Sequence, residues 1–219
     1  MIAEKTGMSQ AFLLRWLWEA TMIDHFVLQY MFVVEWGEER RGDEPRLQFA
    51  FITQSRFGAE VELEDTGRLA DGHGDRRLGM NISAGIPGSV RTFRLPSPEF
   101  HYFGLAVRAI EDDSSDEADR REDKRIFQSL LKTGLDPIFR RGALPTGDDI
   151  WRIANGVPLQ DKRGDDDDKI GVSVRSYPGT GYEIEHLNDG DVYVPSNRMR
   201  FVGDDARWTL DFEIYGGRL

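Results

Sequence analysis

The sequence predicts a mainly β protein: a two-layer antiparallel β-sandwich of about ten strands, with an N-terminal helix and a helical insertion near residues 115–155. Short runs in which apolar and polar residues alternate recur along the chain, as in strands with one buried face. Gly, Pro, Asn and Asp stand between these runs, where tight turns need them. The content of 39% hydrophobic and 11% aromatic residues is sufficient for a buried core.

The length of 219 residues suits a single sandwich domain over residues 1–219. Residues 1–24 are predicted to form a helical segment packed on this domain, beginning at a cap residue, Ser9. Residues 112–169 are predicted to be a helical and loop insertion between two strands. Its first helix has Ser114 and Glu117 at capping-box spacing and Gly134 as the residue after its end, and its second helix is capped by Thr146.

Strands are predicted on both sides of this insertion. Before it they cover 26–36, 47–51, 59–65, 78–84, 90–95 and 100–110, with the "GIPG" motif of residues 85–88 as a turn. After it they cover 170–174, 182–184, 192–194, 199–201 and 208–214. Because successive antiparallel strands run in opposite directions, alternate connections lie at the same end of a sheet. This count places the "DDDD" run and the "NDGD" and "GDDA" turns at one end.

Carboxylates from several loops at one end would supply the six to eight oxygen ligands that Ca²⁺ takes. The predicted ligands are Asp112, Asp113, Asp166, Asp167, Asp189, Asp191, Asp204 and Asp205. The arrangement is similar to that of calcium-dependent C2 domains, which hold their ion at one end of a sandwich, although no motif of that family is present. The alternative is that these aspartates are solvated turn residues.

The formal net charge of −11 and the scattered arginines and lysines argue against a nucleic-acid ligand. The expected partner is a protein or a carbohydrate, and the N-terminal helix is a candidate for docking on a partner or for oligomer formation. Charged residues interrupt the apolar N-terminal stretch, so neither a transmembrane segment nor a signal peptide is expected. These features favour a soluble protein, with the cytoplasm slightly favoured as its compartment.

The function that this pattern favours is a noncatalytic binding or assembly module that displays acidic loops, with Tyr193 and Trp208 near them setting specificity. A first alternative is a glycoside hydrolase using Glu60, Glu62 and Glu64. These residues resemble the E-x-D-x-E signature of a jelly-roll β-glucanase family, except that Glu62 replaces its aspartate. The resemblance implies that Glu60 is the nucleophile and Glu64 the acid/base. A second alternative, based on the aromatic-rich N-terminus, is a membrane-acting or pore-forming protein.

Overall fold

The structure of this chain is a computed structural model. It describes residues 23, 25–36, 44–69, 86–91, 102–112, 116–159, 168–178, 189–203 and 206–218. The elements, in chain order, are β1 (His25–Trp36), β2 (Pro45–Ser55), β3 (Gly58–Arg68), β4 (Ile86–Arg91), β5 (Tyr102–Glu111), α4 (Glu117–Arg140), α5 (Gly147–Asn155), β6 (Asp168–Pro178), β7 (Val192–Gly203) and β8 (Ala206–Gly217).

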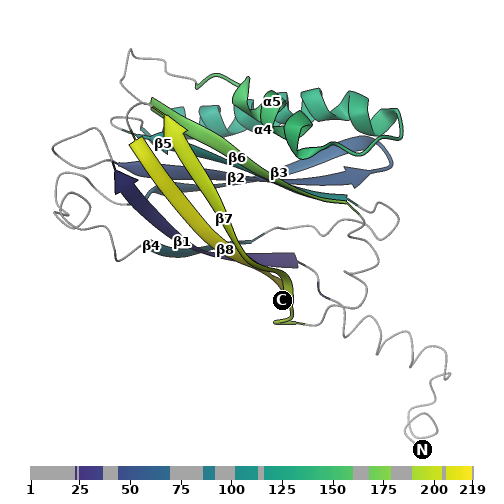
Figure 1. The fold of residues 1–219 in the computed structure, drawn as a ribbon. Helices are drawn as coiled ribbons and strands as arrows, with labels where there is room; N and C mark the ends of the chain where they lie inside the picture. The colour runs from purple at the N-terminus through teal and green to yellow at the C-terminus, as the bar shows by residue number, and fades with distance from the viewer. Residues whose placement is uncertain are drawn as a thin grey trace, which may run out of the picture.

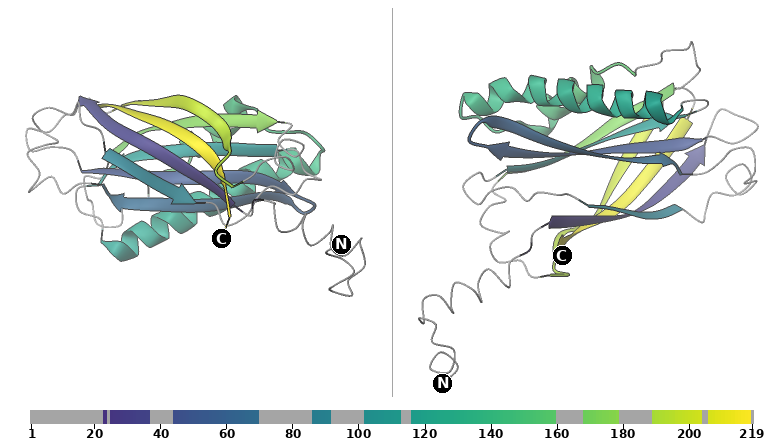
Figure 2. Two further views of the ribbon diagram at one scale, coloured as in Figure 1. Left: turned by 90° about the horizontal axis from the view of Figure 1, so that it is seen from below. Right: turned by 180° about the vertical axis from the view of Figure 1, so that it is seen from behind.

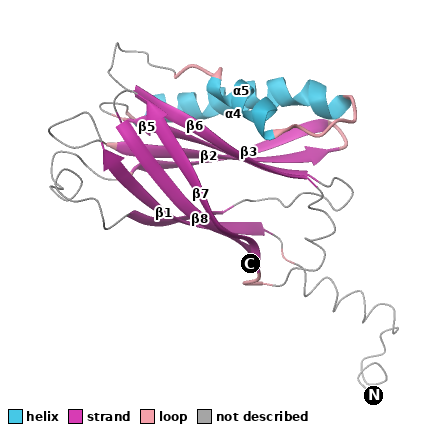
Figure 3. Ribbon diagram, in the orientation of Figure 1, coloured by secondary structure: helices cyan, strands magenta, loops and turns pink. Residues whose placement is uncertain are grey.

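The described strands form two four-stranded antiparallel sheets. Sheet A has the order β4-β1-β8-β7 and sheet B the order β3-β2-β5-β6. Helices α4 and α5 lie on the face of sheet B that points away from sheet A, so the layers are helix, sheet, sheet (Figure 1 and Figure 3). The predicted β-sandwich fits this arrangement, with eight described strands; the predicted count of ten is not confirmed.

Two separate apolar clusters hold these layers together, because alternate residues of a strand face opposite sides of a sheet. On β2, Phe49 and Phe51 face the core between the sheets, whereas Ala50 and Ile52 face the helices. Helix α4 contributes a side chain every fourth residue to the second cluster, from Phe127 through Leu131 and Leu135 to Phe139. Sheet B is therefore buried on both faces.

The two sheets come together along β6 and β7 (Figure 2). Gly203 at the end of β7 leaves no room for a side chain against the Ile170 carbonyl oxygen near the start of β6. Further along, the Arg175 guanidinium on β6 donates to Asn197 Oδ1 at 3.1 Å and to the Arg198 carbonyl oxygen on β7. The end of β7 and the start of β6 therefore lie at the same end of the sandwich.

Two predicted strand boundaries are wrong, and a proline explains both. Strand β4 passes through the predicted "GIPG" turn, and β7 joins two predicted strands across Pro195. Both are edge strands, where a missing backbone N–H is tolerated. A register irregularity between Val194 and Asn197 accommodates Pro195.

The two helices occupy the predicted insertion between β5 and β6, with a different first cap. Asp116, and not Ser114, caps α4, and the helix continues past Gly134 to Arg140. Gly134 faces Ile153 of α5, and a Cβ there would come within 2.6 Å of its Cγ2 atom, so this glycine allows close helix packing. The predicted cap of α5 is confirmed: Thr146 forms a capping box with Asp149. The predicted helix in residues 1–24 lies outside the described residues, apart from Ile23.

Candidate functional site

A network of charged side chains is buried between sheet B and the N-terminal half of α4. Arg108 is fully buried, and its Nη2 atom donates to Asp123 Oδ2 at 2.6 Å and to Gln48 Oε1 at 2.6 Å. Arg46, also buried, donates to Asp65 through Nε and Nη2, the latter at 2.7 Å. Gln48 Nε2 donates to both Asp65 and Asp123 and so links the two ion pairs.

The carboxylate of Asp112, like those of Asp65 and Asp123, accepts from more than one side chain, and it extends the network toward the end of the sheet. It accepts from Arg46 Nη1 at 3.4 Å, Arg68 Nε at 3.1 Å and Arg120 Nε at 3.0 Å. Arg68 also pairs with Glu44 at 2.7 Å. Three guanidinium groups thus surround one buried carboxylate.

Burial and neighbouring charges act in opposite directions on the members of the network, and the balance favours the charged forms of Asp65 and Arg46 but not that of Arg108. Burial alone would raise the pKa of Asp65, but the hydrogen bond and charge of Arg46, with donation from Gln48 and the Gly67 N–H, lower that pKa below its usual value. Burial lowers the pKa of Arg108, and the charge of Asp123 opposes this effect. The Arg108 guanidinium also lies 4.2 Å from the centre of the Phe127 ring, as in a cation–π contact.

The network fixes the packing of α4 on sheet B, and its members Arg46, Gln48, Arg108 and Asp123 are closed to solvent, each at most 2% exposed. Buried charges that are mutually satisfied fix one arrangement of the elements that carry them. These residues were not predicted as a buried group, because polar residues that alternate with apolar ones in a strand usually face solvent. The predicted helical insertion could have indicated their burial, since helices that cover a sheet bury its polar face.

The three glutamates of the hydrolase alternative share one face of β3, as the alternation predicts. Glu60 Oε2 accepts from Lys132 Nζ at 3.2 Å, and Glu64 Oε2 lies 3.9 Å from Lys124 Nζ. Both lysines belong to α4. Burial is the largest cause that raises the pKa of Glu64, and Lys124 opposes it. The outer two glutamates thus attach α4 to the edge of sheet B.

Of the eight predicted calcium ligands, the structure describes Asp112, Asp189 and Asp191. Asp112 is surrounded by arginines, which repel a cation, so its prediction as a ligand is corrected. Asp189 and Asp191 are exposed next to the end of β8, where the Gly216 N–H donates to the Asp191 carbonyl oxygen at 2.9 Å. The predicted ligands Asp113, Asp166, Asp167, Asp204 and Asp205 lie outside the described residues.

The structure does not bring Asp191 and Asp112 together. Asp191 precedes β7, whereas Gly203, at the far end of this strand, lies beside the start of β6. Asp168 at that start is opposite Glu111, the neighbour of Asp112. The prediction that all the acidic turns lie at one end was wrong, because residues 192–194 and 199–201 belong to one strand, β7. Within the described part of the chain, no three His, Asp or Glu side chains form a group that could hold a metal ion.

Sheet A differs from sheet B in that no described helix covers its outer face. Met31 on β1 is 40% exposed, and Val192 and Val202 on β7 are 50% and 68% exposed. A shallow hollow of about 600 Å³ lies across this face. Its polar lining comes from all four strands: Gln29 of β1, Ser89 of β4, Ser196 of β7, and Asp211 and Glu213 of β8.

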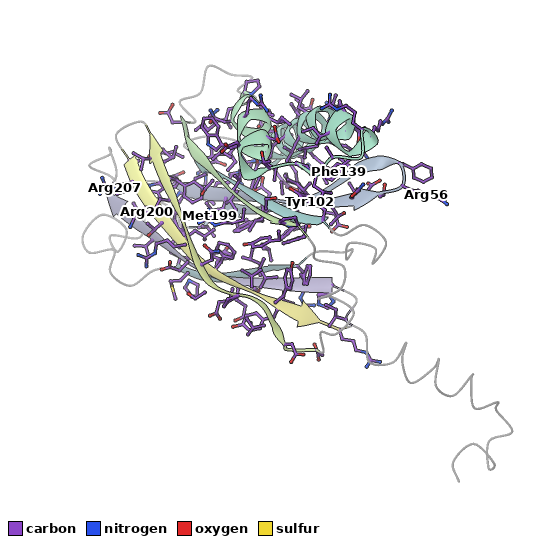
Figure 4. All side chains as sticks on the ribbon, turned by 45° about the vertical axis from the view of Figure 1, so that its right-hand side comes forward. Arg56, Tyr102, Phe139, Met199, Arg200 and Arg207 are labelled. Atoms are coloured by element: carbon purple, nitrogen blue, oxygen red, sulfur yellow. The ribbon has the colours of Figure 1, made fainter. Side chains whose placement is uncertain are left out.

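Charge on this outer face is opposite in balance to the charge of the whole chain. Among its described residues are four arginines and two carboxylates: Arg91, Arg198, Arg200, Arg207, Asp211 and Glu213. Arg198 pairs with Asp211 at 2.6 Å, and this hydrogen bond lowers the pKa of Asp211. Arg200 and Arg207 lie at the same end of sheet A (Figure 4), and neither forms an ion pair with another described residue.

The two aromatic residues predicted to set specificity do not lie on this face. Trp208 is fully buried between the sheets, where its ring is perpendicular to that of Phe32. Tyr193 stacks on Phe26 with 4.9 Å between the ring centres and is partly buried against the same core. Their prediction as specificity residues is corrected, because the inward side of each strand buries them.

Solved structures that resemble this chain include two that contain C2 domains. No family model and no curated protein matches the chain. A C2 domain of a plant extended synaptotagmin 1 has a TM-score of 0.39 and 7% identity, covering 90% of this chain and 97% of that domain. A Drosophila C2-DSL-EGF1 structure has a TM-score of 0.32 and 9% identity, covering 87% of this chain and 67% of the other. At these TM-scores, the likeness supports no inference about ligand or activity.

Proposed function

We propose that this protein is a noncatalytic binding or assembly module that binds through the outer face of sheet A. The observation that carries the proposal is the contrast between the two sheets: helices cover the outer face of sheet B, whereas Met31, Val192 and Val202 are exposed on sheet A. A sheet face that no described helix covers, and that carries exposed apolar residues together with a hollow of mixed polar lining, supports binding of another molecule there.

The hydrolase alternative receives less support from the described residues. Glu60 and Glu64, the nucleophile and acid/base that the β-glucanase resemblance implies, are engaged by lysines of α4. Among the described helices, none is long and apolar enough to cross a membrane.

A variant of the outer face tests the proposal. Met31→Lys combined with Val202→Lys adds charge to sheet A, and Leu130→Lys, at a side chain 43% exposed on α4, is the matched control. Immobilised wild type and both variants are compared for binding of soluble polysaccharides, defined peptides and the protein itself. We expect at least one ligand that wild type and control bind equally and the double variant loses. Ligands that bind all three proteins equally would contradict the proposal.

The acidic loops contribute a second, calcium-dependent part of the proposed function. The contact between Gly203 and Ile170 supports it, because both residues are close in sequence to predicted ligands. The run that contains Asp166 and Asp167 precedes β6, and Asp204 and Asp205 follow β7. We therefore propose that the calcium ligands are these four and Asp113, without Asp112, Asp189 or Asp191.

A further inference from the structure

We propose that the occupant of the outer face of sheet A is the same face of a second copy of this chain. This inference rests on the proposed function, which assigns binding to that face, and it names the partner. The strand register arranges the outward side chains of β1, β8 and β7 in five rows. The rows are Val27, Tyr215 and Val192; Gln29, Glu213 and Ser196; Met31, Asp211 and Arg198; Val33, Thr209 and Arg200; and Arg207 with Val202.

Two features of the rows match each other when the order of rows is reversed about the third row. The most exposed valines, Val192 and Val202, belong to the first and last rows of β7. Glu213 is in the second row, and Arg200 is in the fourth. Reversal therefore brings apolar residues opposite apolar ones and places an arginine near a carboxylate.

A twofold axis produces this reversal if it lies between two stacked sheets, along the third row and perpendicular to the strands. Such an axis stacks β7 on the partner's β7 and β8 on the partner's β8, each in the opposite direction, in an isologous contact. Met31 then meets the same residue of the second copy on the axis. The Arg198–Asp211 pair, already satisfied within each chain, also lies there.

The hollow on this face provides the space that Arg200 of the second copy requires. Ser196 and Glu213 of the second row both line the hollow. Reversal places the fourth row of the other copy over them, so its Arg200 guanidinium enters a space that contains a carboxylate. In the same arrangement, Arg207 lies over the ring of Tyr215 of the second copy, as in a cation–π contact.

One charge contact and the area are consistent with a second copy as the partner. A chain of net charge −11 repels its copies in general, and in this arrangement Arg200 of each copy lies near Glu213 of the other, which opposes that repulsion. Four strands about 4.8 Å apart and five rows about 6.7 Å apart cover roughly 600 Å². Two such faces bury about 1,200 Å² in total, which is at the lower limit of specific interfaces.

The test is sedimentation velocity of the full chain over the micromolar to millimolar range. We expect the wild type to dimerise and Arg200→Glu or Glu213→Arg to weaken the dimer roughly tenfold or more, because each creates two like-charge contacts. A mixture of the two variants should regain the dimer, since both contacts then join opposite charges. Arg121→Glu on α4, whose side chain is 72% exposed, should leave the dimer unchanged.

Three results would overturn the inference: a wild type that stays monomeric, a dimer that both single variants retain, or a mixture that fails to regain the dimer. Circular dichroism of each variant confirms that the fold is intact. A monomeric wild type removes only the second copy as the partner. The binding comparison of the Met31 and Val202 double variant decides separately whether the face binds any other ligand.

Discussion

Asp136 Oδ1, on α4, accepts a hydrogen bond at 2.7 Å from the backbone N–H of Ala59, the second residue of β3. Two turns back along the same side of the helix, Gln128 Nε2 donates to the Val61 carbonyl oxygen at 2.6 Å. Lys132, between them, pairs with Glu60. Helix α4 thus follows the edge of sheet B and satisfies backbone groups there, which blocks pairing with another strand.

Asp136 also lies 3.6 Å from Arg140, so the effect of its acceptor is isolated by comparing two variants that both lose this ion pair. Asp136→Ala leaves the partly buried Ala59 N–H without its acceptor and should cost about 1–3 kcal/mol in the free energy of unfolding. Urea denaturation measures this change. Asp136→Asn is the matched control, because its amide oxygen can still accept the bond. Equal stability of the two variants would show that the bond does not stabilise the fold.

The buried network predicts a larger effect at Asp123, which accepts from Arg108 at 2.6 Å and from Gln48 at 2.8 Å. Asp123→Ala leaves the buried Arg108 without its carboxylate and should cost about 3–5 kcal/mol. Glu122→Ala, which removes a pair with the exposed Arg125, should cost less than about 1 kcal/mol. Similar losses for the two variants in chemical denaturation would mean that the network adds no stability.

Periodicity in the sequence was sufficient to predict the main strands and the site of the helical insertion. Alternation is a local property, and β1, β3 and β8 follow it closely because each has one face in the core. Thr146 identified the start of α5 for the same reason, since a cap depends on residues close in sequence; the structure adds Asp149 as its capping-box partner.

The predicted end of a strand at Pro195 was wrong. A proline ends a strand only where a neighbouring strand would need the missing N–H. Sequence alone does not say that β7 is an edge strand. This one error reversed the assignment of Asp189 and Asp191 to an end of the sandwich. The burial of Arg46 and Arg108 was missed for a similar reason: it depends on α4, which is remote in sequence from Arg46.

The lowered pKa of Asp65 predicts a pH dependence of stability. A carboxyl whose pKa is lower in the folded state stabilises the fold at any pH above its unfolded value, because the unfolded state binds protons more readily. This contribution is lost as the pH falls from near 4, the unfolded value, through the lower folded value. Asp65→Asn should therefore show a smaller decrease in melting temperature than wild type between pH 5 and pH 3, by roughly a few degrees. Parallel melting curves for the two proteins over this range would contradict the assignment.

The last prediction concerns calcium. Four of the proposed ligands are close in sequence to the start of β6 and the end of β7, whereas the control residues Asp189 and Asp191 precede β7 at its opposite end. Ca²⁺ at about one hundred times its dissociation constant should stabilise the fold by about 2.7 kcal/mol, because it binds the folded state preferentially. The melting temperature should rise accordingly, and EDTA should reverse the rise. Replacing Asp166 and Asp167 by Asn should abolish this rise, whereas replacing Asp189 and Asp191, next to Gly216, should leave it intact. A rise that depends on Asp189 and Asp191 would place the ion at the opposite end of β7, and an unchanged melting temperature in wild type would remove calcium from the proposed function.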